Sequence, residues 1–178
     1  MYKIFTYLII AILSLNVEAQ WKPNSSSNNE IRADVAEAIN LFESNSQLEV
    51  YFDQAYGYAI FPSIKKAGIG IGGSRGKGQV FEKGNLIGNT VVTQVSVGFQ
   101  LGAQTFREVI FFKDEQALDR FTRGNFEFGA QASAVVLTEG VAVEVEYSDG
   151  VAIFTETNGG LMYEASIGGQ KFNFNSIE

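Results

Sequence analysis

Short apolar segments joined by hairpin-turn signals are the feature that most constrains the fold of this 178-residue chain. From residue 57 onward, most apolar residues fall in short β-like runs rather than at helical spacing. The runs are punctuated by Lys83-Gly84-Asn85, Tyr147-Ser148-Asp149-Gly150 and Asn158-Gly159-Gly160, which are typical hairpin turns. Nothing supplies the regular helical crossovers that a parallel sheet requires, so we expect antiparallel pairing.

Helical patterns flank and interrupt these runs. A first helix is expected from about residue 31, capped by Asn28 or Asn29, and a second short helix near residues 48–55 is expected to end at Gly57 as its C-cap. Pro62 is expected to stop the strand that precedes it. A third helix begins after Asp114 as its N-cap and ends before Gly124. The prediction is one α+β domain: a mostly antiparallel curved sheet or partly closed β-barrel, with N-terminal helices and one inserted helix.

The N-terminus has the pattern of an export signal. Lys3 precedes the largely apolar run Leu8–Leu15, and Val17-Glu18-Ala19 offers a cleavage site. The apolar run is short for a membrane span, so a cleaved signal peptide is favoured over an uncleaved anchor. We therefore expect a signal peptide at 1–19, a flexible polar tether at 20–29 and a domain at 30–178, with a periplasmic or secreted location.

The composition removes several classes of chemistry. The chain has no Cys and no His, which excludes Ser-His, Cys-His and the usual zinc chemistry. No acid/base pair can be named, so we expect no catalytic residues, no metal, no cofactor and no enzymatic activity. The net charge of −7 also disfavours a nucleic-acid partner.

One segment is both basic and rich in glycine. Residues 65–78 read KKAGIGIGGSRGKG, and Gly68, Gly70 and Gly73 satisfy the spacing G-x-G-x-x-G. A dinucleotide site needs a helix directly after these glycines, whereas the following residues continue as strand. A P-loop would need glycine at position 71 and Ser or Thr at position 78. We therefore expect no nucleotide partner.

The strand period gives another account of these glycines. In a strand, Gly68, Gly70 and Gly72 would share one face, and Ile69 and Ile71 the opposite face. The bare glycine face would then allow close packing or a bend within the molecule, which is the commoner use of strand glycines. The functional alternative is a ligand surface edged by basic residues.

Three ordered segments resemble the SYLF domain family. The run AYGYAIFPSIKKAGIGIGGSRGKGQVF (55–81) is similar to its glycine-alternating signature. VSVGFQLGAQTFREVIFFKDEQALDRF (95–121) and NFEFGAQASAVV (125–136) are similar to the family's two following blocks. On this resemblance, residues 30–178 form a SYLF-type domain.

The resemblance implies lipid binding without catalysis. It places anionic headgroups, or an anionic membrane surface, at the basic glycine segment, with Lys65, Lys66, Gly68, Gly70, Gly72, Arg75 and Lys77 as candidate lipid-binding residues. The expected function is therefore a non-enzymatic phospholipid-binding domain of the bacterial cell envelope. The alternative is a periplasmic structural or protein-interaction module that binds an envelope protein and no lipid.

Overall fold

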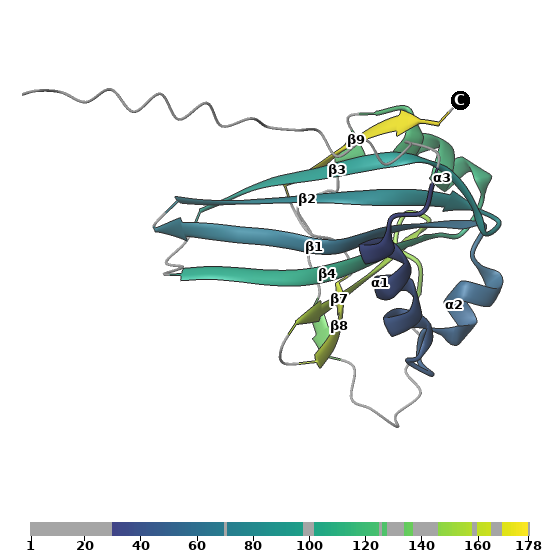
Figure 1. The fold of residues 1–178 in the computed structure, drawn as a ribbon, viewed down its shortest axis with the longest axis horizontal. Coiled ribbons are helices and arrows are strands. Elements are labelled where there is room, and N and C mark those ends of the chain that lie inside the picture. Colours follow the sequence, from purple (N-terminus) through teal and green to yellow (C-terminus); the bar gives the residue numbers. More distant parts are fainter. Residues whose placement is uncertain are drawn as a thin grey trace, which may run out of the picture.

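The computed structural model describes most of the chain from residue 30 onward (Figure 1). The described ranges are 30–69, 71–97, 102–124, 126–127, 134–136, 146–157, 160–164 and 169–177. The predicted signal peptide and tether lie outside them. The helices are α1 (Ala33–Glu43), α2 (Glu49–Gln54) and α3 (Glu115–Thr122). The strands are β1 (Gly57–Ile69), β2 (Ile71–Glu82), β3 (Asn85–Val97), β4 (Gly102–Phe112), β5 (Phe126–Glu127), β6 (Ala134–Val136), β7 (Val151–Thr157), β8 (Gly160–Glu164) and β9 (Gln170–Ser176).

The strands form one antiparallel sheet. Their order is β5-β9-β3-β2-β1-β4-β7-β8-β6, and every pairing among the described residues is antiparallel. The described sheet is open, with β5 and β6 as its two edges. The predicted α+β domain with N-terminal helices and one inserted helix is therefore confirmed.

Pro62 does not stop the first strand, contrary to expectation. β1 continues through it to Ile69, and its register with both neighbours shifts at this point. Between Phe61 and Ile64 the chain advances three residues, while the facing segment of β4 advances two, from Glu108 to Phe106. This extra residue is a β-bulge, one of the few positions where a central strand accommodates a proline that cannot donate to the ladder.

The glycine stretch is a hairpin, so the expectation of one continuous strand is wrong. β1 ends at Ile69, β2 begins at Ile71, and the two strands pair with Gly68 opposite Gly72. Chain direction therefore reverses in the middle of the stretch. The sequence did not reveal this because alternating Gly and Ile continues on both sides of the reversal, without the usual Asn-Gly or Asp-Gly signal.

Helices α1 and α2 cover one face of the sheet at one end (Figure 1). Val35, Ala38 and Phe42 of α1 are buried against a cluster that includes Phe81 and Phe111. This face of the sheet is called the helix face below. Toward their other end, β1 to β4 extend past the helices as a four-stranded projection (Figure 1).

Gln79 of β2 forms hydrogen bonds with the backbone at the start of α1, whose N-cap is not the predicted Asn28 or Asn29. Both asparagines lie outside the described residues. The N-cap is Arg32, which has no side-chain capping bond. Its backbone N–H donates to Oε1 of Gln79 on β2 at 2.9 Å, and Nε2 of Gln79 donates to the Glu30 carbonyl at 2.9 Å. Gly57 likewise does not act as the C-cap of α2, because Ala55 takes that position and Gly57 begins β1.

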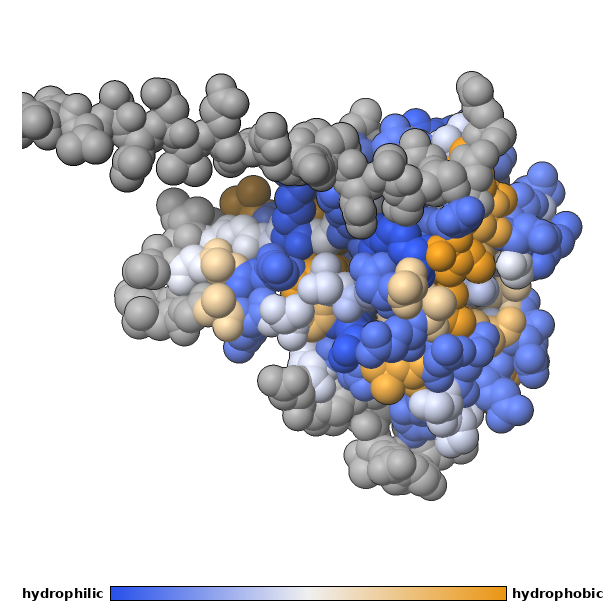
Figure 2. All heavy atoms as spheres, in the orientation of Figure 1, coloured by the Kyte–Doolittle hydropathy of each residue, from blue (hydrophilic) through white to orange (hydrophobic). Residues whose placement is uncertain are grey.

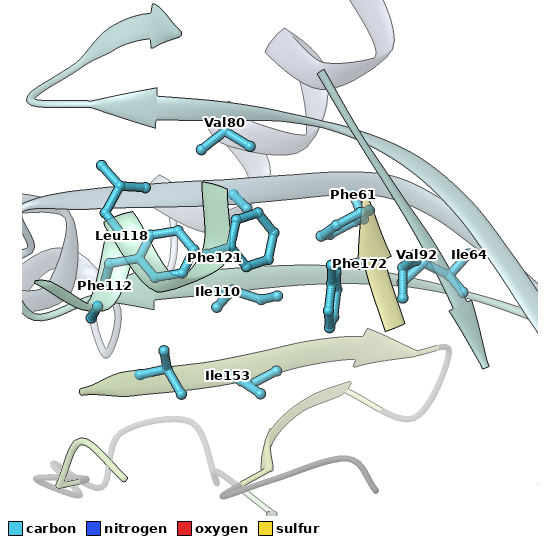
Figure 3. Packing of buried hydrophobic residues seen from close by; sticks show 13 residues of the cluster. Phe61, Ile64, Val80, Val92, Ile110, Phe112, Leu118, Phe121, Ile153 and Phe172 are labelled. Carbon is cyan, nitrogen blue, oxygen red and sulfur yellow. The ribbon is translucent and has the colours of Figure 1, made fainter. Parts of the chain in front are cut away.

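The opposite face encloses a second core around α3 (Figure 3). Phe172 of β9 lies between Phe61 of β1, at a ring-centroid distance of 5.7 Å, and Phe121 of α3, at 5.2 Å. Because β9 and β1 are separated in the sheet by β3 and β2, this contact requires the sheet to curve around the core. This is the curvature that the sequence predicted.

Several local turn and cap predictions are confirmed. The Asp114 carboxylate accepts from the Ala117 N–H at 2.9 Å, and Gly124, past the end of α3, has a φ of +80°. Lys83 and Gly84 both have positive φ in the β2–β3 turn, as a two-residue hairpin loop requires. Within the described ranges, none of the helices has the length and apolar character needed to cross a membrane.

Candidate functional site

Three basic side chains gather on the helix face of the projection. Arg75 and Lys77 are two residues apart on β2, and Lys65 of β1 lies directly opposite Arg75. All three are exposed. Gln79, two residues beyond Lys77, bonds to the start of α1, which fixes the face to which this row belongs. We call Lys65, Arg75 and Lys77 the basic row.

None of the three cations has a carboxylate partner among the described residues. The ion pairs found there join Arg32 to Asp34, Arg107 to Glu156, and Arg123 to Asp119. Like charges placed directly across two strands repel one another. Repulsion between Lys65 and Arg75 therefore raises the free energy of the protein without a ligand. A bound anion would relieve this repulsion.

A row of small side chains lies next to the basic row, toward the hairpin end of the projection. Ala67 faces Gly73 on one side and Ala103 on the other, and Gly73 faces Val95 of β3. Val95 is 73% exposed, the highest value among the exposed large hydrophobic residues. In Figure 2, strongly hydrophilic residues of the projection lie beside neutral and weakly hydrophobic ones. The helix face of the projection therefore combines positive charge with a weakly apolar surface of small residues.

The other candidate residues do not join the basic row. Lys66 pairs with Ser74, and Gly68 pairs with Gly72, on strand positions that alternate with those of Lys65 and Ala67. They therefore lie on the opposite face of the sheet. Lys66 is half-buried there, and Ser74 donates to Oε1 of Gln94 at 3.1 Å. Gly70 lies outside the described residues. The predicted site is thus divided between two faces.

Two other glycines make the closest backbone packing in this segment. A Cβ at Gly78 would lie 2.5 Å from the Ile60 carbonyl oxygen and 2.7 Å from the Phe61 ring. At Gly76 it would lie 2.6 Å from the Ile64 side chain. Both glycines face the bulged part of β1. Sequence reasoning missed them, although their alternation with Arg75 and Lys77 was a usable signal.

The described residues contain no group of three or more acidic side chains arranged to hold a metal ion. The basic row offers positive charge and hydrogen-bond donors to a ligand. Such a surface can hold a phosphate or carboxylate.

Comparison with known proteins finds a family match over part of the chain. Residues 93–176 match the family model named Ysc84, described as Las17-binding protein actin regulator. This match agrees with the SYLF resemblance of the sequence, and residues 93–176 carry a Ysc84 (SYLF) domain match. It is 28% identical over 143 residues to Beta cell expansion factor A of Aeromonas veronii. The alignment covers 75% of this chain and 51% of the relative, so the chain spans about half the length of that curated protein.

Proposed function

We propose that this protein binds anionic phospholipid through the helix face of its projecting sheet. The observation that carries the proposal is the basic row: Lys65, Arg75 and Lys77 are exposed on one face and have no carboxylate partner among the described residues. The family resemblance supports the ligand class. Lys66, Gly68 and Gly72 lie on the opposite face of the hairpin and are not part of this proposed surface.

The energetics favour a weak and reversible attachment. Each basic residue near an anionic bilayer contributes on the order of 1 kcal/mol, so three give about 3 kcal/mol. The row of small residues at Ala67, Gly73 and Ala103 ends at Val95. It allows the sheet to approach the headgroups closely and adds apolar contact. Exposed charge is screened over about 8 Å at physiological ionic strength, so the attachment weakens as salt rises.

The charge distribution also favours one orientation of the protein relative to the membrane. The exposed side chains of α1 include Asp34, Glu37 and Glu43, which an anionic surface repels. The projection extends away from this helix (Figure 1). An approach with the projection leading keeps the acidic helix farther from the membrane. The N-terminal export pattern supports the cell envelope as the location of this membrane.

Sedimentation with vesicles tests the proposal. Wild-type protein is expected to sediment with phosphatidylglycerol vesicles at low salt and to remain free with phosphatidylcholine vesicles. A variant with Lys65→Gln, Arg75→Gln and Lys77→Gln should lose this binding. The matched control replaces Lys83, Lys113 and Arg123, three exposed cations elsewhere in the chain, by Gln.

The control removes the same net charge, so it separates a local site from a general charge effect. Retained binding in the control and lost binding in the basic-row variant support the proposal. Equal binding by the two variants, with both shown folded by circular dichroism, contradicts it.

A further inference from the structure

Among the described residues, the outer edge of β4 has no paired strand beyond the end of β7. β4 pairs with β7 only from Arg107 to Phe112, whereas β4 continues to Gly102. Along Gly102–Phe106 the described strands supply a partner on the β1 side only. In an antiparallel strand, alternate residues direct both N–H and C=O toward one neighbour. About two residues of this stretch therefore present their backbone groups outward.

Three common protections against strand addition are absent from the described edge. Natural edges are commonly blocked by charged side chains, proline or a bulge on the edge strand. The stretch Gly-Ala-Gln-Thr-Phe has no charged residue and no proline, and the bulge of this region lies on β1. Ala103, Gln104 and Thr105 are exposed.

A cleft of about 950 Å³ lies at the same place. Its lining comes from the β1 bulge, the open part of β4 and the end of β7, namely Pro62, Ser63, Ala103, Gln104, Thr105, Phe106, Arg107, Glu156 and Thr157. The Arg107 guanidinium and the Glu156 carboxylate form an ion pair at 3.3 Å, so the charges at this end of the cleft are balanced. Hydroxyl and amide groups make up most of the remaining lining.

We propose that the cleft binds an extended, uncharged peptide segment, which adds to the sheet along Gly102–Phe106 in line with β7. The open edge supplies backbone donors and acceptors, and backbone pairing is the interaction that distinguishes a peptide from other polar ligands. The balanced ion pair favours no charged ligand. Five residues of β4 span roughly 16 Å, enough for a five-residue segment. The site adjoins the basic row, because Thr105 pairs with Lys65, but the peptide pairs with the opposite edge of β4. The proposal holds whether or not the protein binds lipid.

The uncharged peptide acetyl-Thr-Val-Thr-Gln-Thr-Val-amide is a suitable probe for NMR titration of the full chain. We expect chemical-shift changes at Gly102–Arg107 and Glu156–Thr157, with slower amide exchange along the open edge. The matched probe is the same peptide N-methylated at alternate residues, which keeps the side chains and removes the donors facing β4. Its affinity should be at least about tenfold weaker, since two hydrogen bonds are lost.

Charge on the edge provides a second test. Ala103→Lys with Thr105→Lys should reduce binding of the unmodified peptide, because an edge lysine opposes strand pairing. Asn173→Lys with Asn175→Lys adds the same charge at exposed positions on β9 and should leave binding unchanged. Equal affinity for the methylated peptide, shifts centred on another part of the sheet, or no shifts at millimolar peptide would each overturn the proposal.

Discussion

Nε2 of Gln170 on β9 donates to Oε2 of Glu108 on β4 at 3.2 Å, although three strands separate β9 from β4 in the sheet. Both side chains are fully buried. The contact therefore spans the interior of the curved sheet. It joins a strand near one edge to a strand on the far side of the centre, so it reports directly on how strongly the sheet curves.

Replacing Gln170 by Leu should weaken this closure. The substitution removes a donor from a buried carboxyl group, and loss of such a bond costs about 1–3 kcal/mol of folding free energy. Urea unfolding followed by circular dichroism measures the change. Gln104→Leu, at an exposed position on β4, serves as the control and should stay within about 0.5 kcal/mol of wild type. A Gln170→Leu protein as stable as this control would show that the bond does not help to hold the curved sheet.

Gly78→Ala should destabilise the protein by about 1–3 kcal/mol. The added methyl group would meet the Ile60 carbonyl oxygen at 2.5 Å, and a paired backbone group cannot move aside easily. Gly73→Ala is the matched change on the same strand, because its nearest contact would be an ordinary 3.4 Å to the Gln94 carbonyl. Thermal unfolding should therefore separate the two variants. If both variants melt together, β2 is packed less tightly against the bulge than the structure indicates.

Gln79→Ala should loosen the start of α1. Two hydrogen bonds to the backbone around the helix start are lost, a change comparable to removal of an N-cap, which costs about 1–2 kcal/mol. Amide hydrogen exchange in the first turn of α1 should become faster while exchange in α3 stays the same. Gln54 is exposed at the end of α2, so Gln54→Ala should leave amide exchange in both α1 and α3 unchanged. Uniform acceleration across the whole protein would instead indicate a general loss of stability.

Stability should fall as the pH rises from about 10 to about 12. Burial raises the pKa of Tyr147 to about 12, and a hydrogen bond to Glu82 at 2.7 Å raises the pKa of Tyr56 to about 12. The unfolded chain loses these protons near pH 10, below the pKa in the folded state. The contribution of these two tyrosines to folding stability is therefore complete below about pH 10. It is lost as the pH rises to the pKa of about 12 that they have in the folded protein.

Urea unfolding at pH 8 and pH 11 measures this fall. Tyr147→Phe should reduce the change in stability between the two pH values, because it removes one of the phenols whose pKa is raised in the folded protein. Glu82→Gln should lower the pKa of Tyr56 in a spectrophotometric titration, because it removes the carboxylate that accepts the hydrogen bond from the Tyr56 hydroxyl. A tyrosine titration unchanged by Glu82→Gln would contradict the assigned cause.

The fold class was predictable because its signals are local. Turn residues such as Gly84 and the cap Asp114 act over a few positions, and the change of period after residue 57 separates helices from strands. The β1–β2 hairpin was not predictable in the same way. Its reversal lies within a uniform Gly-Ile alternation, and the bulge at Pro62 depends on pairing with β4, which is distant in the sequence.

The candidate site was predicted in composition and not in geometry. The sequence indicated that basic residues and glycines concentrate between positions 65 and 78, and three of the four cations do share a face. The side on which Lys66 lies depends on the register after the bulge, because one inserted residue exchanges the two faces of a strand. The capping role of Gln79 likewise depends on tertiary contacts alone.

Fluorescence from a single labelled cysteine tests most directly whether the projection is the part that meets the membrane. The chain contains no cysteine, so Val95→Cys and Gln116→Cys each carry one environment-sensitive dye, at the small row and on exposed α3 respectively. Phosphatidylglycerol vesicles should shift the emission at position 95 to the blue and leave position 116 unchanged, with salt reversing the shift. A shift at position 116 instead, or equal shifts at both positions, would contradict binding through the basic row.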